Sequence, residues 1–176
     1  MFRFDVCVVG GCGRVGLPLA VAFADKGLKV VIHDLDKEKL AQVKSGVMPF
    51  REEGCQEKLQ SVLKRTLSIG DNPTCISESH FIIVTIGTPV DKHLNPDFSA
   101  MLAFFKNLLP HLVAGHYIVL RSTVYPGTAD KVHRFLEESG VCNPRVATSS
   151  ESGRNHHGVA FGTKNAHSLE APRGFA

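Results

Sequence analysis

The residues of this sequence whose types and spacing could do chemistry begin with three glycines in the pattern G-x-G-x-x-G. They are Gly11, Gly13 and Gly16. A short apolar run at residues 7–10 precedes them, and apolar residues at helical spacing follow them. A second, almost continuous apolar run at residues 28–33 then ends in Asp34. This order predicts a strand, a glycine-rich turn, a helix and a second strand that ends in an acid.

Each of these positions has a physical role in holding a dinucleotide. Gly11 permits the tight turn out of the strand, Gly13 lets the backbone approach a pyrophosphate, and Gly16 lets the helix pack closely on the sheet. The free N–H groups and the positive dipole end of that helix then face the phosphates. Asp34 can hold both hydroxyls of an adenosine ribose, and its charge opposes a 2′-phosphate. The pattern therefore predicts a site for NAD rather than NADP.

Two further apolar runs end in polar residues that could line the same site. Residues 81–87 lead into Thr88, and residues 117–121 lead into Ser122 and Thr123. Both runs are apolar on both faces over most of their length, which is typical of strands buried in a parallel sheet. Because such sheets bind ligands at the carboxyl ends of their strands, these residues are expected to converge with the glycine turn. Each threonine taken alone is more often a turn residue or a helix cap. Their shared position after apolar strands makes a role at the site an equal alternative.

The remaining elements alternate in the same way. Helices are expected after the glycine turn, at 37–44, 55–65 and 129–138, and from Asp97 to Pro110, with strands at 67–69 and 145–148. The first helix is expected to bury one stripe, which is Val15, Leu19, Ala22, Phe23 and Lys26. The alternation predicts an α/β fold, a Rossmann-type doubly wound parallel sheet, as a single domain over residues 1–148. Residues 149–176 show no period, so an irregular or disordered tail is expected.

Composition limits the partners. The 176 residues carry a formal net charge of +3, too small to indicate a nucleic-acid or membrane partner. No apolar run approaches the roughly 20 residues that span a bilayer, and no signal peptide is expected. The five cysteines show no C-x-x-C spacing, which argues against a disulfide framework and favours the cytoplasm. No metal site is predicted, since His156, His157 and His167 are more simply surface residues of a polar tail.

Three motifs in order now resemble one family. Residues 11–20 read Gly-Cys-Gly-Arg-Val-Gly-Leu-Pro-Leu-Ala, residues 86–91 read Ile-Gly-Thr-Pro-Val-Asp, and residues 121–128 read Arg-Ser-Thr-Val-Tyr-Pro-Gly-Thr. They resemble the N-terminal NAD-binding domain of the nucleotide-sugar dehydrogenases, the UDP-glucose/GDP-mannose dehydrogenase family. Residues 88–97 and the third motif are most similar to the UDP-N-acetyl-D-mannosamine dehydrogenase branch. The resemblance covers about residues 4–148.

This resemblance implies how the cofactor, NAD, is held. The amides of Arg14 and Val15 would contact the pyrophosphate, and Asp34 and Lys39 would lie at the adenosine ribose. Thr88 would line the path of the cofactor. Lys39 is equally well explained as a solvated lysine of a surface helix.

The resemblance also implies a reaction. These enzymes oxidise the C6 alcohol of a nucleotide sugar to a carboxylate and reduce two NAD. Thr123 would lie near the nicotinamide and help to order a catalytic water, and Glu151 falls where the family has a glutamate. The family's sugar-binding domain, with its cysteine nucleophile, does not follow, so the chain is expected to be truncated and catalytically incomplete alone. A stand-alone NAD-binding or regulatory module and a small dehydrogenase of another class stay open, as does a homo-oligomer.

Cys12 is the one cysteine within the glycine turn. It precedes the predicted helix, whose positive end is expected to lower the pKa of its thiol. However, it occupies a variable position of the turn, and the family nucleophile belongs to the sugar-binding domain. Cys12 is therefore interpreted as a filler of the turn.

Overall fold

The computed structural model describes residues 1–87, 98–122, 127–141 and 144–148, in which six strands form one parallel sheet. The strands are β1 (Phe4–Val9), β2 (Val30–His33), β3 (Leu67–Gly70), β4 (Ser79–Val84), β5 (Tyr117–Leu120) and β6 (Arg145–Thr148). Their order across the sheet is β3-β2-β1-β4-β5-β6, and every neighbouring pair is parallel. This is the Rossmann order, with a switch point between β1 and β4 at which such sheets bind ligands. The predicted fold class is confirmed.

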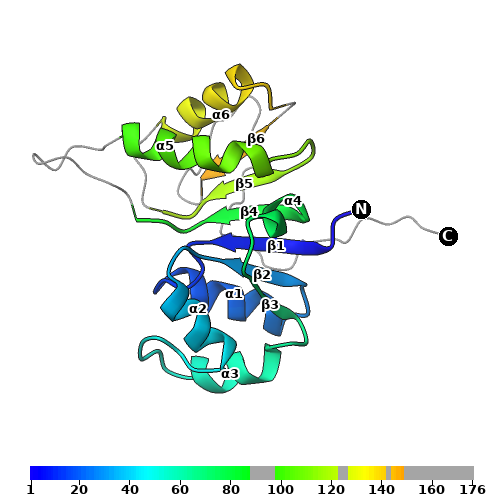
Figure 1. Ribbon diagram of the computed structural model, residues 1–176, viewed down its shortest axis with the longest axis vertical. Coiled ribbons are helices and arrows are strands. Elements are labelled where there is room, and N and C mark those ends of the chain that lie inside the picture. The colour runs from blue at the N-terminus through cyan, green and yellow to red at the C-terminus, as the bar shows by residue number, and fades with distance from the viewer. Residues whose placement is uncertain (88–97, 123–126, 142–143, 149–176) are drawn as a thin grey trace, which may run out of the picture.

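Helices pack on both faces of this sheet (Figure 1). They are α1 (Gly16–Asp25), α2 (Lys37–Lys44), α3 (Cys55–Val62), α4 (Thr74–Ser77), α5 (Phe98–Leu108) and α6 (Thr128–Glu138), with a 3-10 turn η1 (Leu109–His111) after α5. Alternate residues of β1 face different layers. Val6 and Val8 pack in the cluster that includes residues of α1, α2 and α3, whereas Cys7 and Val9 pack with α4, α5 and α6. The central strand is therefore buried on both faces, as its apolar run predicts.

Most element bounds lie within a few residues of the prediction. The predicted helix at 55–65 ends at Val62, because Leu63 is extended and Lys64 has a positive φ of 65°. Strand β4 begins at Ser79, two residues before its apolar run, and α4 was not predicted. Residues 149–176, expected to form a tail, and Asp97, expected to cap α5, lie outside the described residues.

The buried face of α1 differs from the predicted stripe. Its buried residues are Gly16, Leu17, Ala20, Val21 and Ala24. Val15 is 50% exposed, and Ala22 and Lys26 are exposed, although Leu19 and Phe23 are partly buried. The prediction is wrong because the backbone contact of Gly16 with the preceding turn fixes the rotation of this helix. Small residues one and two turns later then share the face that approaches the sheet.

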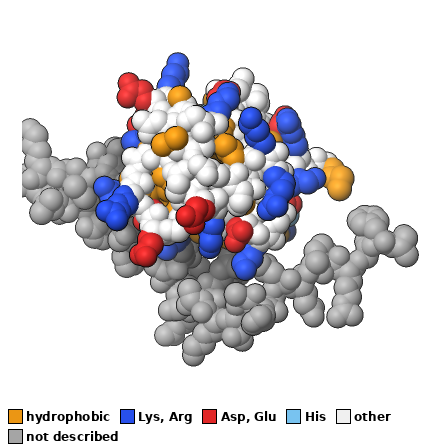
Figure 2. Space-filling view, turned by 90° about the horizontal axis from the view of Figure 1, so that it is seen from below, with side chains coloured by type: hydrophobic (Ala, Val, Ile, Leu, Met, Phe, Trp, Pro, Cys, Tyr) orange, Lys and Arg blue, Asp and Glu red, His pale blue; other side chains and the backbone are white. Residues whose placement is uncertain are grey.

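Two features concern the predicted absence of a nucleic-acid or membrane partner, namely the charges on the surface and the lengths of the helices. Figure 2 shows the face of the molecule that lies at the bottom of Figure 1, where α3 is found, and there Lys and Arg side chains are interspersed with Asp and Glu. This mixture agrees with the small net charge. Within the described residues, no helix combines the length and the apolar character needed to cross a membrane.

Candidate functional site

The glycine turn joins β1 to α1, and backbone bonds anchor it to the end of β2. Gly10 has a φ of 75°, a conformation that suits glycine. The N–H groups of Gly10 and Gly11 donate to the carbonyl oxygen of His33 at 2.9 and 3.3 Å, and the N–H of Gly13 donates to the carbonyl of Gly10 at 3.2 Å. The last residue of β2 therefore supports the first residues of the turn.

The three motif glycines meet different surroundings. A Cβ at Gly11 would lie 2.6 Å from Cγ2 of Ile32, and a Cβ at Gly16 would lie 2.6 Å from the carbonyl oxygen of Gly10. Both contacts are too short for any side chain, so these two positions need glycine for packing. A Cβ at Gly13 would instead meet, among the described residues, just the carbonyl of Gly10 at 3.3 Å. The described residues therefore leave the outer side of Gly13 open, on the turn where a pyrophosphate is predicted to bind.

Thr85, which follows β4, holds the same turn from its other side. Its hydroxyl lies 3.0 Å from the carbonyl oxygens of both Val9 and Gly10 and can donate to one of them at a time. Its N–H donates to the carbonyl of Val9 at 2.9 Å. Sequence reasoning missed this residue and singled out Thr88 instead. The available signal was that Thr85 is the first polar residue after a buried strand.

Three consecutive backbone N–H groups at the start of α1 have no acceptor among the described residues. They belong to Arg14, Val15 and Gly16. The first helical bond runs from the N–H of Leu17 to the carbonyl of Gly13 at 3.0 Å, and no side chain caps the helix. Free N–H groups at the positive end of a helix dipole attract anions. This geometry supports the predicted pyrophosphate contacts of Arg14 and Val15.

Asp34 follows β2, and two backbone amides fix its carboxylate beside the turn. Its Oδ2 accepts from the N–H of Cys12 at 2.8 Å, and its Oδ1 accepts from the N–H of Asp36 at 3.0 Å. A carboxylate oxygen has two lone pairs, so each oxygen can still accept a second hydrogen bond. Asp34 is partly exposed, which leaves it available to a ribose.

Lys39 lies in the first turn of α2, where it forms an ion pair with Asp36. The carboxylate of Asp36 accepts from the N–H of Lys39 at 3.1 Å and contacts Nζ of Lys39 at 2.7 Å. This hydrogen bond and charge raise the pKa of Lys39 and lower the pKa of Asp36. The negative charge of Asp34 also raises the pKa of Lys39, so this ammonium group lies within the field of the predicted ribose acid.

Cys12 is buried in the apolar cluster beneath α1, with no exposed surface. Burial, followed by the negative charges of Asp34 and Asp36, raises the pKa of its thiol to about 12. The expectation of a lowered thiol pKa is therefore wrong, because desolvation and two neighbouring acids outweigh the helix dipole. The side chain packs as a structural residue of the turn.

The carboxyl ends of β4 and β5 are linked beside the turn. The hydroxyl of Ser122 donates to the main-chain carbonyl of Ile86, which links the segments that follow these two strands. The other candidates at this edge, Thr88 and Thr123, lie outside the described residues, and so does Glu151. Their proposed roles stay predictions.

Comparison with known proteins gives one family. The model of the "UDP-glucose/GDP-mannose dehydrogenase family, NAD binding domain" matches residues 4–155. The chain is 34% identical over 131 residues to UDP-glucose 6-dehydrogenase TuaD of Bacillus subtilis, which covers 73% of this chain and 28% of that protein. It is 30% identical over 128 residues to UDP-N-acetyl-D-mannosamine dehydrogenase of Pyrococcus horikoshii, covering 72% of this chain and 30% of that protein.

Solved structures of nucleotide-sugar dehydrogenases also resemble this chain. A UDP-glucose dehydrogenase from Pyrobaculum islandicum superposes with a TM-score of 0.74 and 28% identity over 86% of this chain and 37% of that chain. The UDP-D-ManNAc dehydrogenase of Pyrococcus horikoshii superposes with a TM-score of 0.75 and 27% identity. This match covers 85% of this chain and 37% of that chain. This chain spans about 30% of the length of the curated relatives it matches. The chain therefore belongs to the UDP-glucose/GDP-mannose dehydrogenase family and contains its NAD-binding domain.

Proposed function

We propose that this chain binds NAD for a nucleotide-sugar 6-dehydrogenase, which oxidises the C6 alcohol of a UDP-activated sugar to a carboxylate and reduces two NAD. The observation that carries the proposal is the Asp34 carboxylate fixed on the glycine turn through the N–H of Cys12, just before three backbone N–H groups that have no acceptor among the described residues. The relatives support the substrate class, since they are named for UDP-glucose, UDP-N-acetyl-D-glucosamine and UDP-N-acetyl-D-mannosamine.

The described residues fit NAD at its adenosine and pyrophosphate end. The three free amides would hold the pyrophosphate, and the open side of Gly13 would admit it. Asp34, already oriented by two N–H donors, would accept hydrogen bonds from the ribose hydroxyls. Lys39, beside Asp34, would add a contact at the same ribose. NAD supplies a hydride acceptor when it is bound, and these residues orient it.

The roles proposed for residues at the nicotinamide end of the cofactor rest on the sequence motifs. Thr88 is proposed to line the cofactor path, and Thr123 to order a catalytic water near the nicotinamide. Glu151 is proposed as a catalytic acid or base. All three lie outside the described residues, so their roles depend on the resemblance to the family.

Calorimetric titration of the purified chain with NAD and NADP tests the cofactor proposal. Asp34 is expected to favour NAD by at least about tenfold, a difference of about 1.4 kcal/mol. In Asp34→Asn, NAD should bind more weakly and the preference should shrink, because the lost charge no longer opposes a 2′-phosphate. Equal or tighter binding of NADP by the wild type would overturn the assignment.

Turnover assays test the second half of the proposal. The chain should bind NAD but form no steady NADH from UDP-glucose, UDP-N-acetyl-D-mannosamine or GDP-mannose, because it spans about 30% of the curated relatives. Positioning of the substrate alone can supply about 7–11 kcal/mol of catalysis, and that contribution needs a sugar site. Steady turnover of a nucleotide sugar by this chain would show a complete active site. Turnover of simple alcohols alone would favour another dehydrogenase class.

A further inference from the structure

Arg14 is the one charged residue of the glycine turn, residues 10–16. Its backbone N–H is one of the three without an acceptor among the described residues, and its side chain is exposed. The ion pairs between described residues do not include Arg14. Lys39, beside the predicted ribose acid, is by contrast already paired with Asp36. Within the described part of the chain, the charge of Arg14 is therefore uncompensated.

The guanidinium of Arg14 contacts the ring of Phe50. Cζ of Arg14 lies over this ring, 5.8 Å from its centroid. A guanidinium within about 6 Å of a ring centroid is attracted by the negative face of the ring. This contact joins the turn between β1 and α1 to the segment between α2 and α3. Contact with a ring face uses none of the N–H donors of the guanidinium, so these donors stay available to a ligand.

Phe50 is itself held in place, so it can support the guanidinium. Its ring is half-buried and packs against the apolar cluster beneath α1. Gln56 of α3 holds the residues that precede Phe50. The Oε1 atom of Gln56 accepts from the N–H of Met48 at 2.9 Å, and its Nε2 donates to the carbonyl of Gly46. The segment that carries Phe50 is therefore anchored both to the core and to α3.

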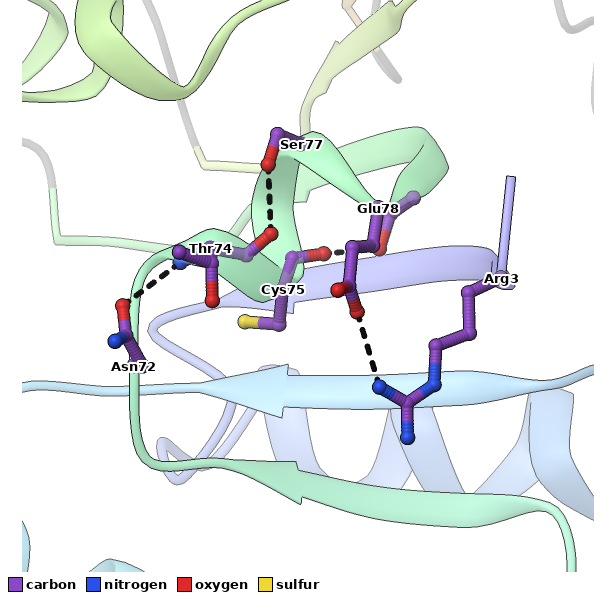
Figure 3. Close-up of polar contacts among 7 residues, drawn as sticks. Arg3, Asn72, Thr74, Cys75, Ser77 and Glu78 are labelled. Carbon is purple, nitrogen blue, oxygen red and sulfur yellow. Dashed lines mark hydrogen bonds and ion pairs between the residues drawn. The ribbon is translucent and has the colours of Figure 1, made fainter. Parts of the chain in front are cut away.

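Arg3 offers a comparison within the same chain. Its Cζ lies over the ring of Phe4, 5.0 Å from the centroid, in a contact like that of Arg14. However, the guanidinium of Arg3 also forms an ion pair with Glu78, in which Nη1 and Oε2 are 3.3 Å apart (Figure 3). Arg3 precedes β1 and Arg14 follows it, so the two arginines lie at opposite ends of this strand. The arginine without a described carboxylate partner is the one at the predicted pyrophosphate site.

We propose that the side chain of Arg14 is a further pyrophosphate ligand and that Phe50 positions it, roles that rest on the proposed binding of NAD. Free N–H groups and a helix dipole carry only partial charges, so they leave part of the pyrophosphate charge unbalanced. A guanidinium supplies a full charge and pairs with phosphate through parallel hydrogen bonds, which a lysine ammonium cannot form. Phe50 need not touch the cofactor, because it acts by holding the guanidinium of Arg14 beside the turn.

Titration calorimetry with NAD in low and in high salt tests the role of Arg14. Arg14→Ala keeps the backbone N–H, so a loss of affinity belongs to the side chain. This variant should bind NAD about tenfold more weakly in low salt, and the difference should shrink in high salt, because salt screens a charge contact. Arg14→Lys should recover only part of the loss, and the matched control Arg3→Ala should bind NAD like the wild type.

The outcomes separate this proposal from the proposed function. Wild-type affinity in Arg14→Ala, or an equal loss at both salt concentrations, would overturn the role of the Arg14 side chain while NAD binding stands. A wild type that does not bind NAD would instead overturn the proposed function.

Substitutions of Phe50 test the positioning role in the same titrations. Phe50→Leu keeps an apolar side chain against the core but removes the ring, so NAD should bind about threefold more weakly. Phe50→Tyr keeps the ring face and should retain the wild-type affinity. In the Arg14→Ala background, Phe50→Leu should cause no further loss, because Phe50 acts through Arg14. An equal loss in both backgrounds would refute the positioning role. The Arg14 variants decide the ligand role even where Phe50→Leu fails to fold.

Discussion

Two single-methyl substitutions, Gly16→Ala and Gly13→Ala, should separate the packing role of the glycine turn from its binding role. A Cβ at Gly16 would lie 2.6 Å from the carbonyl oxygen of Gly10 and 2.8 Å from Cα of Gly11. Both atoms belong to the backbone, so the turn itself must move. A Cβ at Gly13 would meet the carbonyl of Gly10 at 3.3 Å, which a shift of a few tenths of an ångström relieves. The two variants add the same group three residues apart.

The magnitudes follow from these distances. Overpacking of this kind costs about 1–3 kcal/mol, and about 2 kcal/mol lowers the melting temperature of a chain of this size by roughly 4–8 °C. Gly16→Ala should therefore lose that much stability and also bind NAD at least about tenfold more weakly, because the displaced turn misplaces the free amides. Gly13→Ala should melt within about 2 °C of the wild type, yet lose NAD affinity by a similar factor, because its methyl group fills the side open to the pyrophosphate.

Differential scanning calorimetry and isothermal titration with NAD measure the two effects independently. Gly87→Ala is a suitable folding control, since a Cβ at Gly87 would meet no described atom within 4 Å. A Gly16→Ala variant with the melting temperature and NAD affinity of the wild type would refute the packing argument. A Gly13→Ala variant that binds NAD normally would show that the pyrophosphate does not pass this side of the turn.

Three other perturbations have definite expected outcomes. Thr85→Val removes the hydroxyl bond to the turn, worth about 1 kcal/mol, so titration should show NAD binding about fivefold weaker with the fold retained. Burial raises the folded-state pKa of Cys12 above its unfolded value of 9.0, so stability present below pH 9.0 should fall as the pH rises toward about 12. Urea unfolding at several alkaline pH values should show a shallower loss in Cys12→Ala. Lys39→Ala should leave the melting temperature unchanged, because its ion pair with Asp36 is exposed, but should weaken NAD binding severalfold in titrations through the lost contact with the ribose.

The sequence predicted the elements whose side chains show a clear period. Helix α2 forms at the predicted residues, with Leu40 and Val43 buried, and strand β6 also matches its prediction. The alternation of apolar strands with helical segments predicted the parallel sheet. By contrast, α4 has four residues, which are too few to show a helical period. The side-chain oxygen of Asn72 accepts a hydrogen bond from the N–H of Thr74, an arrangement that is also common in ordinary turns.

The errors at the site arise from tertiary contacts and burial, which a pattern of residue types does not contain. The rotation of α1 is set by the backbone contact of Gly16 with Gly10, which a pattern of hydrophobic residues does not contain. Thr85 acts on carbonyl groups of a strand that lies far away in the sequence, so its role required the β1–β4 register. For Cys12, the sequence located the helix end correctly but gave no measure of burial, and burial decides the direction of its pKa shift.

The central position of β1 has a consequence for folding during synthesis. Strand β1 can pair with β2 once His33 has left the ribosome, and β3 can join them soon afterwards, since Val30 pairs with both Val6 and Leu67. The other edge of β1 must wait for β4, which begins at Ser79. Until then the nascent chain presents an unpaired strand with apolar side chains, and such edges promote aggregation. Nascent chains released before β4 is made are therefore expected to be the aggregation-prone species of this protein, and chaperone contacts should be concentrated there.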